Sequence, residues 1–196
     1  MNYLENYIND LNDYVEFKFL DKFLINKNPK SLLKYMSDNI NYGVEYKGKI
    51  YKGNELDSVF DLYGDDKIRV LQPDELYKNE IGTCYDQTIF EYVCFNKLGY
   101  TCDMYYIFQF PNYSHSYVVF MKDNKFFHFE NAFFNYRGIH GPYSNPNQIR
   151  DDVYKHMVME GGREDMGYSF AKLDPKKYVG NYNLTYKKFF DYSKVS

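Results

Sequence analysis

The sequence predicts an α+β fold, in which a helix packs on one face of an antiparallel sheet. Three consecutive patterns support this prediction. Residues 82–100 form an amphipathic stretch with a clear start and stop, and residues 101–110 form an apolar run typical of a buried strand. Residues 115–131 then alternate around a turn, which predicts a hairpin. The order helix, strand, strand, strand favours antiparallel neighbours.

Length and composition predict one globular domain. The chain has 196 residues, of which 44% are hydrophobic and 26% charged. The net charge is -3, with both signs scattered along the chain. Because no run of Lys and Arg is long enough, we expect neither a nucleic-acid nor a membrane partner. We expect residues 1–80 to form a helical N-terminal extension or lobe, and residues 81–196 to form the core.

The N-terminal eighty residues are expected to be largely helical at first. Apolar positions at three- and four-residue spacing predict a helix over residues 1–15, and a second helix is expected with Ser31 as its N-cap. Residues 43–53 alternate and predict a strand or hairpin around Lys47 and Gly48. Residues 53–80 are polar and are expected to be irregular, except for a short turn or helix starting at Pro73.

The helix of residues 82–100 has the strongest boundary signals. Gly82 breaks the preceding chain, Thr83 can cap the helix, and Asp86 completes a capping box three positions later. Gly99 is a typical C-terminal stop. The helix therefore begins at or next to Cys84.

The second half of the chain carries weaker signals. The hairpin of residues 115–131 is expected to turn at Asp123 and Asn124. Residues 134–148 are rich in Gly, Pro and Asn and predict a long loop, followed by a surface helix over 147–159. The segment from Asp174 onward has no assignable pattern.

Cysteine usage and the N-terminus favour a cytoplasmic location. The first residues lack the apolar core of a secretion signal, and no apolar run approaches the length of a membrane-spanning helix. Three cysteines are then most simply free thiols in a reducing compartment, with a Cys94–Cys102 disulfide as the alternative.

Cys84 occupies the position in the helix that favours a reactive thiol. Backbone N–H groups in the first turn have no intrahelical partner, and their partial positive charge favours thiolate over thiol. The thiolate is the nucleophile, and the N–H of Cys84 could also hold an oxyanion. The alternative is that Cys84 is only a small apolar residue at a helix start.

A nucleophilic cysteine needs a base, and the chain offers four histidines. His156 falls on the predicted surface helix, and His140 in the Gly-rich loop. His115 opens the first strand of the hairpin, and we interpret it as the base. His128 shares a strand face with the hairpin's last acid and is the alternative base.

Glu130 closes the second strand of the hairpin and is predicted to orient His115. A turn centred near Asp123 places residue 130 opposite either residue 115 or residue 117, and both registers keep His115 and Glu130 on one face. A carboxylate there can accept the imidazole N–H and stabilise the imidazolium. Asn131 is a rival for this role, but it should point to the opposite face.

At these residues the chain resembles the transglutaminase-like superfamily of cysteine enzymes. The resemblance covers residues 81–134, about a quarter of the chain, and is carried by "GTCYDQ", "LGY", "SHSYVVF" and "FHFEN". It implies a papain-like core with Cys84 as nucleophile, His115 as base and Glu130 as orienter. The superfamily usually has Asp in the third place and often Trp after the cysteine, where this chain has Glu130 and Tyr85. Arylamine N-acetyltransferases share the order, but their Arg-Gly-Gly-x-Cys start is absent.

Four further residues are candidates for the site. Gln72 is a candidate oxyanion donor, and Tyr85, Tyr117 and His140 are expected to contact substrate. We expect acyl transfer through a thioester on a peptide or carboxamide of a protein or peptide substrate, without cofactor or metal. Proteolysis, deamidation and cross-linking remain open, as does the oligomeric state.

Two other functions compete with this one. The same core can serve as a non-enzymatic module that binds a protein. Alternatively, the side chains of Cys84, His115, His128 and Glu130 have the ligand types of a zinc site.

Overall fold

The computed structural model describes residues 17–109 and 113–193, and its fold is α+β. The helix expected over residues 1–15 lies outside the described residues. A five-stranded antiparallel sheet runs in the order β6-β5-β4-β3-β7. Its strands are β3 (Cys102–Gln109), β4 (Tyr113–Lys122), β5 (Lys125–Glu130), β6 (Gly138–Tyr143) and β7 (Tyr168–Lys172).

Helix α6 (Cys84–Lys97) packs on β3 and β4, as the sequence predicts. It begins after the N-cap Thr83, whose capping box with Asp86 is formed. The chain leaves the helix through Gly99, whose φ of 82° suits glycine. The helix is buried along nearly its whole length, so it forms the centre of the larger apolar core.

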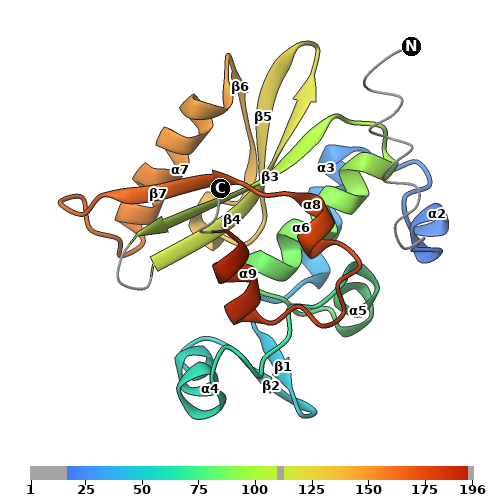
Figure 1. The fold of residues 1–196 in the computed structure, drawn as a ribbon. Coiled ribbons are helices and arrows are strands. Elements are labelled where there is room, and N and C mark those ends of the chain that lie inside the picture. Colours follow the sequence, from blue (N-terminus) through green and yellow to red (C-terminus); the bar gives the residue numbers. More distant parts are fainter. Residues whose placement is uncertain (1–16, 110–112, 194–196) are drawn as a thin grey trace.

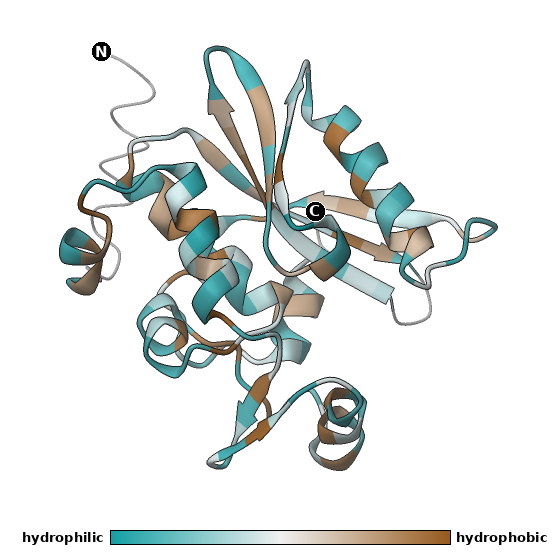
Figure 2. Cartoon of the chain, turned by 180° about the vertical axis from the view of Figure 1, so that it is seen from behind, coloured by the Kyte–Doolittle hydropathy of each residue, from teal (hydrophilic) through white to brown (hydrophobic). Residues whose placement is uncertain are grey.

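Helix α7 (Pro146–Met159) covers the opposite face of the sheet (Figure 1). Alternation along β3 separates the two cores, because Met104 and Tyr106 face α6 while Tyr105 and Ile107 face α7. Figure 2 shows hydrophilic and hydrophobic residues in bands along α7, as expected of a helix with one face against the sheet.

The β4–β5 hairpin has one of the two predicted registers. Asp123 and Asn124 both have positive φ, 51° and 56°, which gives the tight turn of a two-residue hairpin. Lys122 faces Lys125 and Val118 faces Phe129. Continued to the strand ends, this register places residue 117 opposite residue 130.

The N-terminal half agrees with the sequence in its hairpin and differs at one helix start. Strands β1 (Val44–Tyr46) and β2 (Lys49–Tyr51) pair around the predicted turn. Helices α2 (Phe19–Phe23) and α3 (Pro29–Asn39) precede them. The N-cap of α3 is Asn28, not Ser31, because Ser31 lies at the third helical position and completes a capping box with Asn28.

Residues 53–80 are more regular than expected. They contain α4 (Glu55–Tyr63) and α5 (Pro73–Asn79). The predicted start at Pro73 is confirmed, but the expectation of irregular structure is wrong for α4. The helical spacing of Leu56, Val59 and Phe60 is the signal for this helix, and these residues face the core, where Val59 is completely buried.

The loop predicted over residues 134–148 is also wrong. It contains a 3₁₀ turn (Phe134–Tyr136) and the edge strand β6, which pairs with β5 so that His140 lies opposite His128. Gly and Pro are tolerated there because β6 is an edge strand with one free side.

The unassigned C-terminal segment folds back against α6. It forms α8 (Pro175–Tyr178) and α9 (Tyr186–Ser193), and Tyr186 and Phe189 enter the larger core. In Figure 1, α9 lies beside the start of α6. Over residues 17–109 and 113–193, no helix is both long and apolar enough to cross a membrane.

Candidate functional site

The start of α6 is held by one buried carboxylate. Asp86 accepts hydrogen bonds from the Leu71 N–H (2.6 Å), the Thr83 N–H (2.6 Å), the Thr83 hydroxyl (2.9 Å) and the Tyr186 hydroxyl (2.8 Å). Burial raises the pKa of Asp86 to about 6, although these bonds lower it. Asp86 is thus mainly ionised at neutral pH, and it ties two distant segments, at Leu71 and Tyr186, to the turn that carries Cys84.

Gly82 lets the chain approach this turn closely. A Cβ added at Gly82 would lie 2.8 Å from the Asp86 Cβ and 2.8 Å from the Leu76 Cδ1. Such contacts are too short for a side chain of any size. The glycine that the sequence marks as a helix breaker is therefore required by packing.

His115 and Glu130 form a buried pair at the ends of β4 and β5. The His115 Nε2 lies 2.7 Å from the Glu130 Oε2, and the two residues are only 1% and 2% exposed. The second carboxylate oxygen accepts the Phe133 N–H at 2.8 Å, and the Phe133 ring stacks on the imidazole at 3.9 Å. Both the carboxylate and the imidazole plane are thus fixed.

The pair favours its charged form. Burial lowers the pKa of His115, but the Glu130 charge and hydrogen bonds with Cys84 and Glu130 outweigh burial and raise the pKa to about 10. Burial raises the pKa of Glu130, but the charge and hydrogen bond of His115 hold it well below its ordinary range. At neutral pH the structure therefore favours an imidazolium beside a carboxylate.

The Cys84 thiol interacts with the same imidazole. A hydrogen bond and a charge interaction with Cys84 both contribute to the raised pKa of His115. Because Nε2 is engaged by Glu130, the ring nitrogen left for the thiol is Nδ1. The structure thus brings together Cys84, His115 and Glu130, the three residues that the sequence singles out.

His128 lies on the far side of Glu130 and is poorly placed to act as the base. Its Nε2 is 3.3 Å from the Glu130 Oε2, but the geometry is not that of a hydrogen bond, and neither ring nitrogen has a hydrogen-bond partner among the described residues. Burial lowers the pKa of His128. The ring is fully buried and neutral, next to Tyr117 at 4.9 Å between centroids.

Asn131 points away from the imidazole, as strand alternation predicts. Its Nδ2 donates to the Gln87 Oε1 at 2.8 Å, and its Oδ1 accepts the Ser37 hydroxyl at 3.3 Å. Asn131 therefore connects the sheet to α6 and α3, while Glu130 is the partner of His115.

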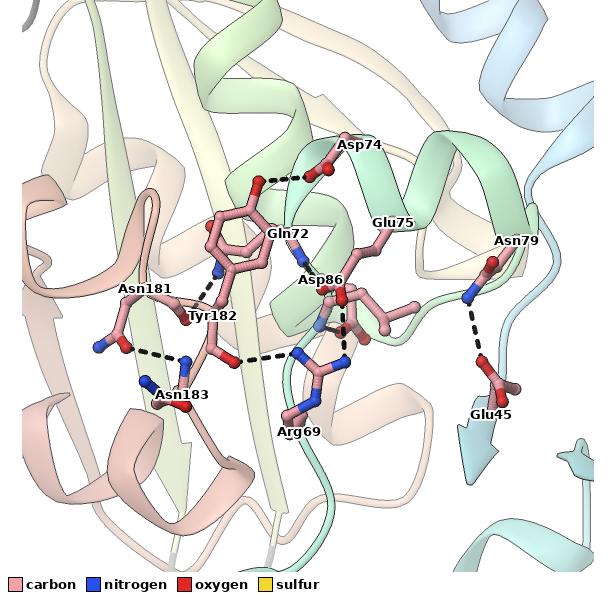
Figure 3. Close-up of polar contacts among 11 residues, drawn as sticks. Glu45, Arg69, Gln72, Asp74, Glu75, Asn79, Asp86, Asn181, Tyr182 and Asn183 are labelled. Atoms are coloured by element: carbon pink, nitrogen blue, oxygen red, sulfur yellow. Dashed lines mark hydrogen bonds and ion pairs between the residues drawn. The ribbon is translucent and has the colours of Figure 1, made fainter. Parts of the chain in front are cut away.

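The expectation that Gln72 donates to an oxyanion is not supported by its contacts. The Gln72 Nε2 donates to the backbone carbonyls of Tyr178 and Asn181, both at 3.2 Å, and its Oε1 accepts the Gly180 N–H at 2.7 Å. No amide hydrogen is left over. Gln72 braces α5 against the C-terminal segment, together with Arg69 (Figure 3).

The three residues predicted to contact substrate, Tyr117, Tyr85 and His140, lie in different surroundings. Tyr117 shares the strand face of His115, with 5.9 Å between ring centroids. Tyr85 bonds to the Ser114 hydroxyl at 2.6 Å and stacks on Phe189 at 4.5 Å, so it packs under α9. His140 stands in β6 rather than in a loop, where its Nε2 is 2.8 Å from the Tyr136 carbonyl oxygen. Tyr85 and His140 therefore have structural partners.

Tyr42 is a site residue that sequence reasoning missed. Burial raises the pKa of Tyr42, and the neighbouring Cys84 raises it further, so the two side chains lie close together. Nothing in the local sequence around Tyr42 marks it, because the contact depends on how the N-terminal lobe packs. Cys84 itself is only 5% exposed.

The other thiols lack these features. All three cysteines are free. Burial raises the pKa of both Cys94 and Cys102, and Cys102 lies against the Tyr92 carbonyl at 3.7 Å. In the described part of the chain, no three His, Cys, Asp or Glu side chains are grouped so that they could hold a metal ion.

No family model matches this chain, and no curated protein sequence is significantly similar to it. The resemblance to the transglutaminase-like superfamily is therefore carried by the residues quoted above.

Proposed function

We propose that this protein is a cysteine-dependent acyl-transfer enzyme that acts on peptide or carboxamide bonds through a thioester. The observation that carries the proposal is the contact series from the Cys84 thiol to the His115 ring and on to the Glu130 carboxylate. Each member sits at the end of a regular element, where packing fixes its side chain.

The chemistry follows from these roles. The Cys84 sulfur attacks the carbonyl carbon, forming a C–S bond while the carbonyl oxygen becomes an oxyanion. As the C–N bond breaks, the His115 imidazolium gives its proton to the departing amine or ammonia. Neutral His115 then takes a proton from water or from a primary amine, which attacks the thioester and releases the thiol. Glu130 stabilises the imidazolium throughout.

The N–H of Cys84 supports the same assignment. It belongs to the first turn of α6, where it has no intrahelical acceptor. The oxyanion would form next to the sulfur, so this N–H is close to where negative charge develops. A helix start therefore provides both partial positive charge next to the sulfur and one hydrogen-bond donor.

A second function is favoured by the burial of the site. Cys84, His115 and Glu130 are each at least nine-tenths buried, and Tyr42 lies close to Cys84. A closed site of this kind suits a catalytically inactive transglutaminase-like module that binds another protein. The two functions differ in whether the Cys84 thiol reacts in the folded protein.

Thiol reactivity in the folded protein tests the proposal. Iodoacetamide is added at pH 7, and alkylation of each cysteine is followed by peptide mass spectrometry. Cys102 is a matched internal control, because it is slightly more exposed than Cys84, at 8% against 5%. We expect Cys84 to react at least about tenfold faster than Cys102, since only Cys84 has an imidazolium partner.

Two variants complete the test. Cys84→Ala should remove the fast-reacting thiol, while Cys102→Ala should leave it in place. His115→Gln should slow the alkylation of Cys84 without unfolding the protein, as judged by circular dichroism. Equal reactivity of the two thiols, or no reaction of Cys84 before unfolding, would refute an activated nucleophile and favour the binding module.

A further inference from the structure

Side chains in the first turns of α6 bond to the residues on either side of His115. The Tyr85 hydroxyl lies 2.6 Å from the Ser114 hydroxyl. The Thr88 hydroxyl donates to the Ser116 hydroxyl at 3.0 Å. Ser114 and Ser116 are the two neighbours of His115 along β4. The helix that begins at the proposed nucleophile is thus bonded to β4 directly before and directly after the proposed base.

The same helix bonds to the residue that follows Glu130. The Gln87 Nε2 donates to the Gly82 carbonyl at 2.9 Å, and the Gln87 Oε1 accepts the Asn131 Nδ2 at 2.8 Å. A backbone carbonyl can only accept, so the Gly82 carbonyl fixes which end of the Gln87 amide meets Asn131. One side chain therefore connects the turn just before Cys84 with the residue just after β5.

Strand alternation allows these bonds to form without blocking the site. Neighbouring side chains along a strand point to opposite faces, so the residues that flank His115 and Glu130 face α6. The two cores show the same division, because Tyr117 packs with α7 and Val118 packs with α6. The bonds to α6 therefore hold the backbone of both site residues. The side chains are left to face each other, with 2.7 Å between the His115 Nε2 and the Glu130 Oε2.

We propose that Gln87 and Thr88 are positioning residues of the acyl transfer, which hold the turn that carries Cys84 at reacting distance from His115. This proposal rests on the proposed function. Both residues act through their partners on the sheet, so neither takes part in bond making or proton transfer. Each of these two bonds joins side chains that are no more than 2% exposed. A misplacement of reacting groups by about 1 Å can cost about 100-fold in rate, so the bonds are tight enough to matter.

The pH dependence of alkylation separates positioning from stability in the full-length protein. Iodoacetamide rates of Cys84 and Cys94 are measured at pH 6 and pH 9 by peptide mass spectrometry. Cys94 is completely buried, so its rate reports unfolding. A thiol that loses an imidazolium partner ionises only at higher pH. We expect Gln87→Met to slow Cys84 by about 10- to 100-fold at pH 6, and by less than about threefold at pH 9.

Paired variants keep the test independent of folding. Gln87→Met alone leaves the Asn131 amide without its acceptor, whereas adding Asn131→Leu removes both partners, which can be nearly neutral for stability. The double variant should therefore regain the urea midpoint of wild type, yet still alkylate slowly at Cys84 at pH 6. Thr88→Val with Ser116→Ala forms the second pair and should show the same separation of stability from reactivity.

Gln109→Met is the matched control, because Gln109 is also only 2% exposed. Its Nε2 donates to the Arg163 and Met166 carbonyls, at 2.5 and 2.9 Å, in the loop that leads to β7. It should destabilise the fold and leave the ratio of the Cys84 rates at pH 6 and pH 9 unchanged. The positioning role is wrong if both double variants keep the wild-type rate at pH 6, if Gln87→Met slows Cys84 equally at the two pH values, or if the control changes the ratio as much. If wild-type Cys84 is no faster than Cys102 at pH 6, it is the proposed function that fails.

Discussion

Replacing Glu130 with Gln isolates the charge that supports His115. Gln has nearly the same shape, so packing around Phe133 is retained. The amide cannot serve both partners, however, because Glu130 accepts from the Phe133 N–H on one oxygen and from His115 on the other. Glu130→Gln therefore removes the negative charge and leaves one buried donor without an acceptor.

The loss of folding stability expected for Glu130→Gln follows from the burial of the His115–Glu130 pair. His115 and Glu130 are 1% and 2% exposed, so solvent screens their interaction little. Removing one member of a buried ion pair typically costs about 3 to 5 kcal/mol. We expect Glu130→Gln to lower the free energy of unfolding by about this amount at pH 6, measured by urea denaturation.

The pH dependence separates charge from packing. The pKa of His115 is raised from 6.5 to about 10 in the folded state, so its contribution is complete below pH 6.5 and is lost as the pH rises toward 10. Over that window the stability of wild type should fall by up to about 1.4 kcal/mol per pH unit from this group. The variant lacks the main cause of the shift, so its stability should fall less steeply.

The difference between wild type and variant should therefore narrow by about 1 to 3 kcal/mol between pH 6.5 and pH 8.5. Glu164→Gln, on the exposed surface, is the matched control and should show no such narrowing. A constant difference across this range would mean that Glu130 contributes by packing alone, and the reasoning about the charged pair would be wrong.

Three further substitutions test the frame around the site by urea denaturation. Gly82→Ala should cost about 1 to 3 kcal/mol, because its Cβ would lie 2.8 Å from the Asp86 Cβ; a neutral result would show that α6 shifts easily. Tyr186→Phe removes a donor to Asp86 and should cost about 1 to 3 kcal/mol. The bond lowers the pKa of Asp86, which burial raises to about 6, so this cost should be larger at pH 8 than at pH 4; the opposite trend would contradict it. Gln72→Leu leaves the Gly180 N–H without its acceptor and should cost about 2 to 4 kcal/mol; a loss below about 0.5 kcal/mol would indicate that water replaces the amide.

Local sequence signals were sufficient to predict the helix and the hairpin that carry the candidate site. The capping box of Thr83 and Asp86 fixes the start of α6, and a two-residue turn fixes the register of the hairpin. These patterns depend on residues a few positions apart. As a result, the meeting of His115 and Glu130 could be predicted from alternation and turn position alone.

Other features depend on contacts that no local pattern reports. The side chain of Gln72 bonds to Tyr178 and Asn181, which lie more than 100 positions away, so the sequence around it does not show that its amide is engaged. Tyr42 lies close to Cys84 because its neighbours Asn41 and Gly43 pair with the backbone of Glu80 and Gly82. Strand β6 was taken for a loop because its Gly and Pro outweigh its weak alternation, and only pairing with β5 reveals it.

The bond between Tyr186 and Asp86 joins positions 100 apart. Because of this bond, the position of the turn that carries Cys84 depends on whether α9 has packed against α6. During synthesis, Cys84 emerges from the ribosome long before α9 does, so the segment around it lacks its final clamp until nearly the whole polypeptide has been made. Clipping the chain ahead of Tyr186 would likewise loosen the turn that carries Cys84, although Cys84, His115 and Glu130 would all remain in the chain.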